Sequence, residues 1–357
     1  MAQPLKELIN TESVGRLAGG LAAAWAPFAR EEFVRAALAG LDGLELKERV
    51  RHVAGALAAA LPVPFPQAAG LLREAVAQAP LDLWSGWPAT DYVALHGLDH
   101  LDEAMGTLAV LTRHSTGEFA VRPFLDRYEE RALAVMHRWA GSPDEHIRRL
   151  ASEGSRPRLP WGARVPWLMR PGPTLPILDL LRDDPSEYVR RSVANHVNDL
   201  AKDHPEVALR LLDRWRSEGG SHVEKVLRHA VRGLLRSGHS GALTLVGAQP
   251  GQGSVEKLIL DHDQVTIGGH LRFNVTVAAA APGALVLRYA VRRDGSRRVF
   301  HLGERTADAG GQTFTLAKSH SFKPVTTRTE PPGPRVLEIV VNGTVRASAP
   351  FDLLDTP

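Results

Sequence analysis

SPDEHIRRLAS at residues 142–152 and DPSEYVRRSVA at residues 184–194 are two copies of one pattern. Aligning their proline and their paired arginines gives an offset of 42 residues. This offset is typical of HEAT and armadillo repeats, in which each unit is a small group of helices. A weaker third copy, HVEKVLRHAVRGLL, occupies residues 222–235. The repetition predicts a solenoid of stacked helix pairs.

Each copy places basic residues beside an apolar position, and equivalent positions of successive repeats line one face of a solenoid. We therefore expect a basic stripe that can follow a phosphate backbone, with one arginine of each pair facing the groove and the other in an ion pair between repeats. The stripe comprises Arg148, Arg149, Arg190, Arg191 and Arg228. Asn195, His196 and Asn198 follow it, and either contact phosphate or sugar or bond within the helix pair.

The first 112 residues also predict helices, because apolar residues recur there with helical spacing between proline and glycine breaks. Trp84, Trp87 and Tyr92 lie close together, and we favour a core aromatic cluster over a base-stacking platform. His96 and His100 have the spacing of a metal pair on a helix. No third ligand follows them in a suitable position, so we predict no metal site.

The pattern changes at residue 247, where GAQPGQGS has the composition of a linker. Apolar and polar residues then alternate as in strands, and Asp294-Gly295 and Asn342-Gly343 are hairpin-turn signals. These signals predict an immunoglobulin-like β-sandwich without a disulfide, since the chain has no cysteine. The predicted fold class is multidomain, α then β, with an α-solenoid of HEAT-like repeats at 1–246 and the β-sandwich at 247–357.

Charge is unevenly distributed along the chain. Residues 1–112 hold 8 basic and 13 acidic side chains, whereas residues 113–240 hold 22 and 17. This asymmetry suits a polyanionic partner that touches the middle and the C-terminal part of the chain. The beginning lacks the pattern of a signal peptide, no stretch can span a bilayer, and the lack of cysteine fits a reducing compartment. We therefore expect a cytoplasmic protein.

Two carboxylates stand out within the basic region. Glu118 lies between a polar turn and an apolar run in TGEFAVRPFL, and Glu153 lies where a helical pattern ends before Trp161. Four arginines surround Glu153 in the sequence, namely Arg148, Arg149, Arg156 and Arg158. A charge run of this kind is usually a solvated or ion-paired face, and that interpretation stays open here.

Three motifs carry a family resemblance: GEFAVRPFL (117–125), RRLASEGSRPRLPWG (148–162) and DDPSEYVRRSVANHVNDL (183–200). Together they resemble the AlkC subfamily of bacterial alkylbase DNA glycosylases, which are built from HEAT-like repeats. The resemblance implies hydrolysis of the N-glycosidic bond of cationic alkylated bases, such as 3-methyladenine and 3-methylcytosine, in double-stranded DNA. It implies no cofactor or metal, no membrane, and a monomer with no obligate protein partner.

The resemblance also implies site residues. Glu118 and Glu153 would be the catalytic carboxylates, Trp161 would face the sugar or lesion, and Arg149 would anchor a phosphate or orient a carboxylate. The predicted DNA-binding residues are Arg148, Arg149, Arg156, Arg158, Arg190, Arg191 and Asn195 in the repeats, and Lys318, His320, Lys323, Thr327 and Arg328 in the sandwich. The last group lies in LAKSHSFKPVTTRTEPPGPRVLEIVVNG, where Glu330-Pro331 replaces expected aromatic residues.

Two other functions remain open from the sequence. HEAT folds are common scaffolds, so the chain could bind DNA or protein without catalysis, or it could be an RNA-binding solenoid. The sandwich could equally stabilise the fold or bind a protein. Carboxylates beside phosphate-binding arginines favour the enzyme, because a pure DNA-binding scaffold gains nothing from them.

Overall fold

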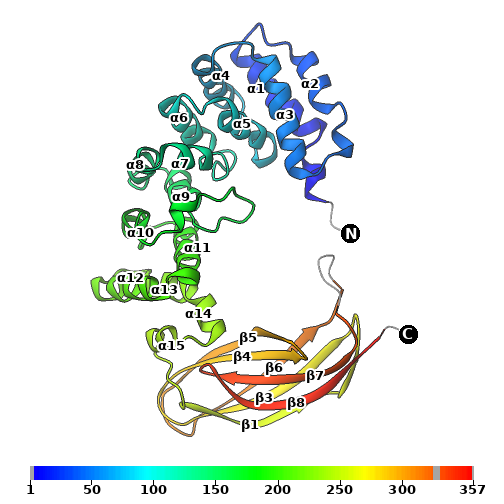
Figure 1. The fold of residues 1–357 in the computed structure, drawn as a ribbon, viewed down its shortest axis with the longest axis vertical. Helices are drawn as coiled ribbons and strands as arrows, with labels where there is room; N and C mark the ends of the chain where they lie inside the picture. The colour runs from blue at the N-terminus through cyan, green and yellow to red at the C-terminus, as the bar shows by residue number, and fades with distance from the viewer. Residues whose placement is uncertain (1–3, 325–329, 356–357) are drawn as a thin grey trace. The chain divides into compact units, whose positions relative to one another are not determined.

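The computed structural model describes residues 4–324 and 330–355. These residues form two compact units. One unit holds the chain up to Asp203 together with Gly219–Val226, and the other holds His204–Glu218 together with the chain from Leu227 onward. The first is helical and the second combines short helices with a β-sandwich (Figure 1).

The helices of the first unit follow one another in stacked order from blue to green in Figure 1. They are α1 Thr11–Ala24, α2 Arg30–Leu38, α3 Leu46–Ala60, α4 Phe65–Gln78, α5 Leu83–His96, α6 Leu101–Leu111, α7 Arg122–Tyr128, α8 Glu130–Trp139, α9 Glu145–Gly154, α10 Leu175–Leu181 and α11 Glu187–Asp203. Short 3₁₀ helices lie at Leu5–Leu8, Leu41–Gly43 and Pro166–Met169. Helix α13, Val223–Ala230, begins in this unit.

Local sequence sets where these helices begin. Asn10 caps α1 and Asp82 caps α5, each in a capping box with the serine three residues later. Asp144 caps α9 by accepting from the backbone N–H groups of His146 and Ile147. The caps satisfy N–H groups that would otherwise lack partners at the helix ends.

Several helices pack on a helix beyond their immediate neighbour, as α3 does on α5, α4 on α6 and α9 on α11. Many side-chain hydrogen bonds also join residues that lie about one repeat, or 42 residues, apart. Arg148 bonds Asp184, Ser192 bonds Ser152, and Arg156 bonds Asp199, with separations of 36, 40 and 43 residues. The predicted repeat is therefore visible as a ladder of bonds between α9 and α11.

In the second unit, α12 Pro205–Glu218, the end of α13, α14 Arg232–Ser237 and α15 Ser240–Leu245 precede the strands. The strands are β1 Gly253–Leu260, β2 Gln264–Thr266, β3 His270–Ala279, β4 Gly283–Arg293, β5 Ser296–Ala307, β6 Thr313–Ser321, β7 Gly333–Val341 and β8 Thr344–Leu354. They form a three-stranded sheet, β1-β3-β6, and a five-stranded sheet, β2-β8-β7-β4-β5, in which only β2 and β8 pair in parallel among the described strands.

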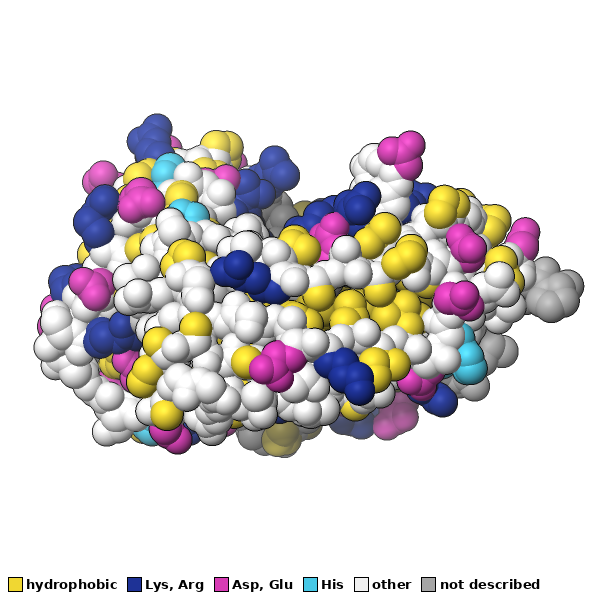
Figure 2. All heavy atoms as spheres, turned by 90° about the horizontal axis from the view of Figure 1, so that it is seen from below, with side chains coloured by type: hydrophobic (Ala, Val, Ile, Leu, Met, Phe, Trp, Pro, Cys, Tyr) yellow, Lys and Arg dark blue, Asp and Glu magenta, His cyan; other side chains and the backbone are white. Residues whose placement is uncertain are grey.

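The two sheets share one core, which confirms the predicted sandwich. Leu271, Phe273, Val275 and Val277 of β3 are buried at alternate positions and pack in a cluster that also includes Leu337 of β7. This alternation is the period-two signal that the sequence carried. On the face seen in Figure 2, hydrophobic side chains gather between bands of polar and charged surface.

Both predicted hairpin turns are confirmed. Arg293 pairs with Ser296 across Asp294-Gly295, and Val341 pairs with Thr344 across Asn342-Gly343. Asn342 and Gly343 have φ of 45° and 79°, as the tight turn of a hairpin requires.

Asn342 also fixes the stretch predicted as a linker. Its side-chain amide donates to the carbonyls of Gln249 and Ala284, and Ala248 is fully buried. GAQPGQGS therefore connects the two secondary-structure types but is held against the sandwich.

No single helix within 4–324 and 330–355 is long and apolar enough to cross a membrane. Only α3 and α4 taken together meet that test, and they are bent by 112° relative to each other.

Candidate functional site

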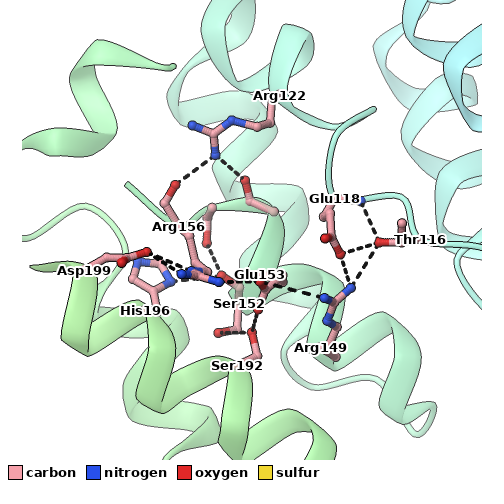
Figure 3. A network of polar contacts seen from close by, with 12 residues as sticks. Thr116, Glu118, Arg122, Arg149, Ser152, Glu153, Arg156, Ser192, His196 and Asp199 are labelled. Atoms are coloured by element: carbon pink, nitrogen blue, oxygen red, sulfur yellow. Dashed lines mark hydrogen bonds and ion pairs between the residues drawn. The ribbon is translucent and has the colours of Figure 1, made fainter. Parts of the chain in front are cut away.

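Glu118 lies in the loop between α6 and α7 and is 8% exposed. Its Oε2 accepts hydrogen bonds from Thr116 Oγ1 and from Nη1 of Arg149 on α9, and the same Nη1 donates to Thr116 at 3.1 Å (Figure 3). Among the described residues, none donates to Oε1 of Glu118. One oxygen is thus fixed in place while the other is available to a water molecule or a ligand.

Glu153 lies in the last turn of α9 and is also buried, at 6% exposed. Its Oε1 accepts from Nη1 of Arg156 at 2.6 Å, and its Oε2 accepts from Oγ of Ser192 on α11 at 2.6 Å. Burial alone would raise the pKa of Glu153, but Arg149, Arg156 and the Ser192 hydroxyl together hold this pKa below its usual value. Glu153 is therefore an anion at neutral pH with both oxygens engaged.

Arg149 joins the two carboxylates. Its Nη1 bonds Glu118, its Nη2 lies 3.8 Å from Oε1 of Glu153, and its guanidinium lies over the ring of Tyr188. Burial disfavours the charge, yet Glu118 and Glu153 raise the pKa of Arg149. The network places two negative charges around one shared cation, so Arg149 orients carboxylates, one of the two roles predicted for it.

Two further residues brace the chain around the carboxylates. Asp199, 1% exposed, accepts from Arg156 at 2.8 Å and so fixes the cation beside Glu153. Arg122, also 1% exposed, donates to the backbone carbonyls of Gly154, Arg156 and Ala163. These bonds hold the segment that leads from α9 past Trp161.

Gly154 allows the end of α9 to approach α7 closely. A Cβ at this position would lie 2.5 Å from Cγ2 of Val121 and 3.1 Å from Cε of Met136. Only glycine fits there without moving its neighbours, which explains the glycine that follows Glu153.

Trp161 is 60% exposed and has a φ of 64°, a left-handed conformation that costs energy for a residue with a side chain. Lys47 of α3 donates to its backbone carbonyl. The ring lines a cavity of about 220 Å³ together with residues of α3, α5 and the start of α7, including Trp87, Asp91 and Phe119. An exposed aromatic ring on a strained backbone, near Phe119 that directly follows Glu118, is typical of a binding site rather than of a core.

Comparisons with known proteins agree with this arrangement. Residues 254–355 match the family described as "Uncharacterised protein YhaZ, C-terminal Ig-like domain". "Uncharacterized protein YhaZ" of Bacillus subtilis (strain 168) is 35% identical over 357 residues, covering 98% of this chain and 99% of that protein. The structure of "Pseudomonas fluorescens alkylpurine DNA glycosylase AlkC bound to DNA containing an abasic site analog" is similar with a TM-score of 0.91 and 34% identity, covering 99% of this chain and 100% of that one. The chain belongs to the AlkC subfamily.

In this AlkC chain the first arginine of each pair bonds the turn before its own helix. Arg148 donates to the carbonyls of Ser142 and Pro143 and bonds Asp184 of the next repeat at 2.6 Å. Arg190 makes the corresponding bonds to the carbonyls at positions 184 and 185. The expected ion pair between repeats is thus present at Arg148. The guanidinium groups of Arg148 and Arg190 are hydrogen-bonded to the turns that precede their own helices. Neither arginine is therefore one of the exposed cations expected in the basic stripe.

The other predicted DNA-binding residues of the repeats lie in different surroundings. Arg156 is 7% exposed and bonds Glu153 and Asp199, which makes it part of the carboxylate network. Arg158 and Arg191 are exposed and pair with Asp203 at 2.6 Å and Glu187 at 2.9 Å, respectively. Asn195 is half-buried on α11. Arg228 pairs with Glu304 of β5 at 3.2 Å, within the second unit.

Three of the predicted sandwich residues lie in or just after β6. Lys318 is half-buried and Lys323 is exposed. His320 packs among the rings of Tyr289, Phe300 and Phe322, and burial lowers its pKa to about 4. His320 is therefore neutral near pH 7 and cannot serve as a phosphate-binding cation there. Thr327 and Arg328 lie outside the described residues.

The aromatic cluster of the first repeats is mostly internal, as predicted. Trp87 and Tyr92 are 6% and 3% exposed, and His96 and His100 contact aromatic rings. Trp87 nevertheless also lines the cavity beside Trp161. Among the described residues, no group of three or more His, Asp or Glu side chains is placed to hold a metal ion.

Sequence reasoning missed Arg122, Ser192 and Asp199. All three lie inside the motifs that carried the resemblance, but each type of side chain is common in loops and helices. Their importance comes from contacts 32 to 43 residues away, as in the bonds of Arg122 to Gly154 and of Arg156 to Asp199. The repeat offset is the one sequence signal that could have suggested Ser192 and Asp199 as neighbours of Glu153 and Arg156.

Proposed function

We propose that this protein is a DNA glycosylase that hydrolyses the N-glycosidic bond of cationic alkylated bases, such as 3-methyladenine and 3-methylcytosine, in double-stranded DNA. The observation that carries the proposal is the pair of buried carboxylates, Glu118 and Glu153, joined through Arg149. The exposed Trp161 lines a cavity together with Phe119, which directly follows Glu118. The similarity to an alkylpurine DNA glycosylase that was solved with DNA supports it. The protein would act as a cytoplasmic monomer without a metal, cofactor or protein partner.

Two carboxylates suit this hydrolysis because the leaving group, the alkylated base, is already positively charged. When the glycosidic bond breaks, the base takes both electrons and leaves as a neutral molecule, and positive charge develops on the deoxyribose. A fixed anion near the sugar stabilises this oxocarbenium-like state. Glu153, ionised and fully hydrogen-bonded, supplies such a fixed charge.

Glu118 suits a second role because its Oε1 is open. A carboxylate oxygen with no protein donor can accept a hydrogen bond from water and orient it toward C1′. The water oxygen then bonds to C1′ and its proton passes to the carboxylate or to solvent. Trp161 would lie against the sugar or the lesion, where the electron-rich face of its ring favours a nearby cation.

The test is release of free 3-methyladenine and 3-methylcytosine from methylated duplex DNA, measured by chromatography for the wild type, Glu118→Gln and Glu153→Gln. Each variant should lower release at least about 100-fold, the order of effect seen when a single electrostatic contact to a transition state is removed. Binding to DNA with an abasic-site analogue should stay within a few-fold of the wild type. Glu12→Gln, which removes an exposed ion pair with Arg16 on α1, is the matched control.

The competing function is a HEAT-type scaffold that binds DNA or protein without catalysis. It predicts salt-sensitive DNA binding without base release from the wild type. If release is present and unchanged in both Gln variants, the enzyme remains but the roles assigned to Glu118 and Glu153 are wrong.

A further inference from the structure

Ser192 contacts Glu153 from the neighbouring repeat, and any catalytic importance of this contact rests on the proposed function. The hydroxyl of Ser192, on α11, lies 2.6 Å from Oε2 of Glu153 and 3.0 Å from Oγ of Ser152. It is 3% exposed, so bulk water cannot replace its hydrogen bond readily. Figure 3 shows Ser152 and Ser192 lying together below Glu153, on the side away from Arg122.

Which group donates in each of these hydrogen bonds follows from the number of protons that each side chain carries. A serine hydroxyl donates once, and an ionised carboxylate only accepts. Ser192 must therefore give its proton to Glu153, and Ser152 must give its own proton to Ser192. The result is a directed chain of hydrogen bonds from α9 to α11 and back to the carboxylate on α9.

His196 holds Ser152, the first residue in this chain of hydrogen bonds. Its Nδ1 lies 2.9 Å from the backbone carbonyl of Ser152, and its Nε2 lies 3.0 Å from Oγ1 of Thr174. A carbonyl only accepts, so Nδ1 carries the proton, and Nε2 of the neutral ring accepts from Thr174. The side chain is 1% exposed, and burial lowers the pKa of His196 to about 4, in agreement with a neutral ring. His196 thus holds the backbone of Ser152, one residue before Glu153.

We infer that Ser192 is a positioning residue for Glu153: its hydroxyl, oriented by Ser152 and supported by His196, holds Oε2 so that Oε1 stays directed at Arg149 and Arg156. Because α9 is short and Glu153 stands in its last turn, its own helix alone does not fix the carboxylate. The donor comes from the next repeat, so the catalytic charge is placed by the stacking of two repeats.

The experiment compares Ser192→Ala, Ser192→Thr and the control Ser155→Ala in single-turnover base release from DNA that contains 3-methyladenine, across pH 4 to 9. Ser155 is a fully buried serine beside Glu153 whose hydroxyl donates to the backbone carbonyls of Ala151 and Ser152 on its own helix. The charged or titratable groups that face Glu153 are Arg149 on α9, Arg156 in the following loop, Tyr188, His196 and Asp199 on α11, and Glu118 through Arg149. All of them stay unchanged in the three variants.

Ser192→Ala should slow release about 10- to 100-fold, the effect of one hydrogen bond to a charged group, with affinity for abasic-site DNA unchanged. Loss of the donor raises the pKa of Glu153, so the decline of the rate toward acid should begin at a higher pH. Ser192→Thr, which keeps the hydroxyl, should recover most of the rate, and Ser155→Ala should match the wild type.

Equal rates and pH profiles for Ser192→Ala and Ser155→Ala would overturn the inference and leave the glycosylase intact. A wild type that releases no base would instead refute the proposed function. If Ser192→Ala does not fold, Ser192→Cys replaces it, since a thiol keeps the volume but donates weakly. A Cys variant as fast as Ser192→Thr would then reject the positioning role.

Discussion

Trp161 combines a binding ring with a backbone conformation that suits glycine, and the two properties can be separated. Trp161→Ala and Trp161→Gly both remove the ring, so both should lose base release. Only glycine relieves the left-handed φ of 64°, so Trp161→Gly should be more stable than Trp161→Ala by about 1 kcal/mol. Chemical denaturation of the two variants measures this difference, and equal stabilities would mean that the backbone at this position is not strained.

A second single residue, His196, makes the stability of the folded protein depend on pH. In the unfolded chain a histidine titrates near 6.5, whereas the pKa of His196 in the folded protein is about 4. Between these values the unfolded state binds a proton that the folded state does not. The stability gained from the neutral ring is therefore complete above about pH 6.5 and is lost as the pH falls toward 4, by up to about 1.4 kcal/mol per unit.

Denaturation of the wild type and of His196→Gln between pH 7 and 4 measures this dependence. The variant should show a shallower decline, because one of its two strongly shifted histidines is gone. His320, whose pKa is also about 4, should keep the remainder. Equal declines for the two proteins would show that His196 is already charged in the folded state.

At the scale of elements, the first arginine of each pair bonds the turn before its own helix, whereas the second arginines differ, since Arg149 is buried between two carboxylates and Arg191 is exposed. Arg148 and Asp184 have side chains that are 13% and 3% exposed and join α9 to the turn before α11, whereas the side chain of Arg191 is 63% exposed. Breaking a buried pair leaves an uncompensated charge and costs about 3 to 5 kcal/mol, while exposed pairs contribute less than about 1 kcal/mol. Arg148→Ala should therefore lower the unfolding free energy by about 3 kcal/mol and Arg191→Ala by less than about 0.5 kcal/mol. Comparable losses, measured by chemical denaturation, would contradict this division.

The elements themselves could be predicted because their signals are local. The alternation in β3, the two hairpin dipeptides and the 42-residue repeat needed no knowledge of distant residues. The two carboxylates and Arg149 were found through motifs, whereas the bonds from Ser192 and Arg156 to Glu153 were not. Whether Arg149 or Arg148 faces Glu118 depends on the rotation of α9, and the adjacent arginines look alike in sequence. The bond from Ser192 depends on how two repeats stack, which no local pattern specifies.

At the scale of the whole molecule, the sequence located the change from helix to strand but not the packing units. Residues 204–246 were assigned to the repeats, whereas residues 204–218 and 227–246 fall in the same compact unit as the strands and Gly219–Val226 falls in the first unit. Gly238 shows why, since a Cβ there would lie 3.1 Å from the backbone of Gly343 in the β7–β8 turn. Sequence composition alone carries no information about this contact.

Deletion of residues 247–357 should weaken DNA binding or base release while the helices up to Asp203, which belong to the first unit, stay folded. The measurements are circular dichroism for folding and DNA affinity at several salt concentrations. If the sandwich contributes phosphate contacts, the slope of log affinity against log salt should become less steep in the truncated chain. A truncated chain with full activity and an unchanged slope would assign the sandwich a role outside DNA binding.

The hydrogen bonds that join residues about one repeat apart limit where repeats can be inserted or lost in such chains. Whole units can be duplicated or lost in a solenoid when each contacts only its neighbours. Glu118, Arg149, Glu153 and Ser192 draw on three successive segments, so a unit inserted between residues 117 and 203 would pull the two acids and their donors apart. The central segments must therefore be inherited as a block, together with α3 and α5, whose residues line the cavity at Trp161.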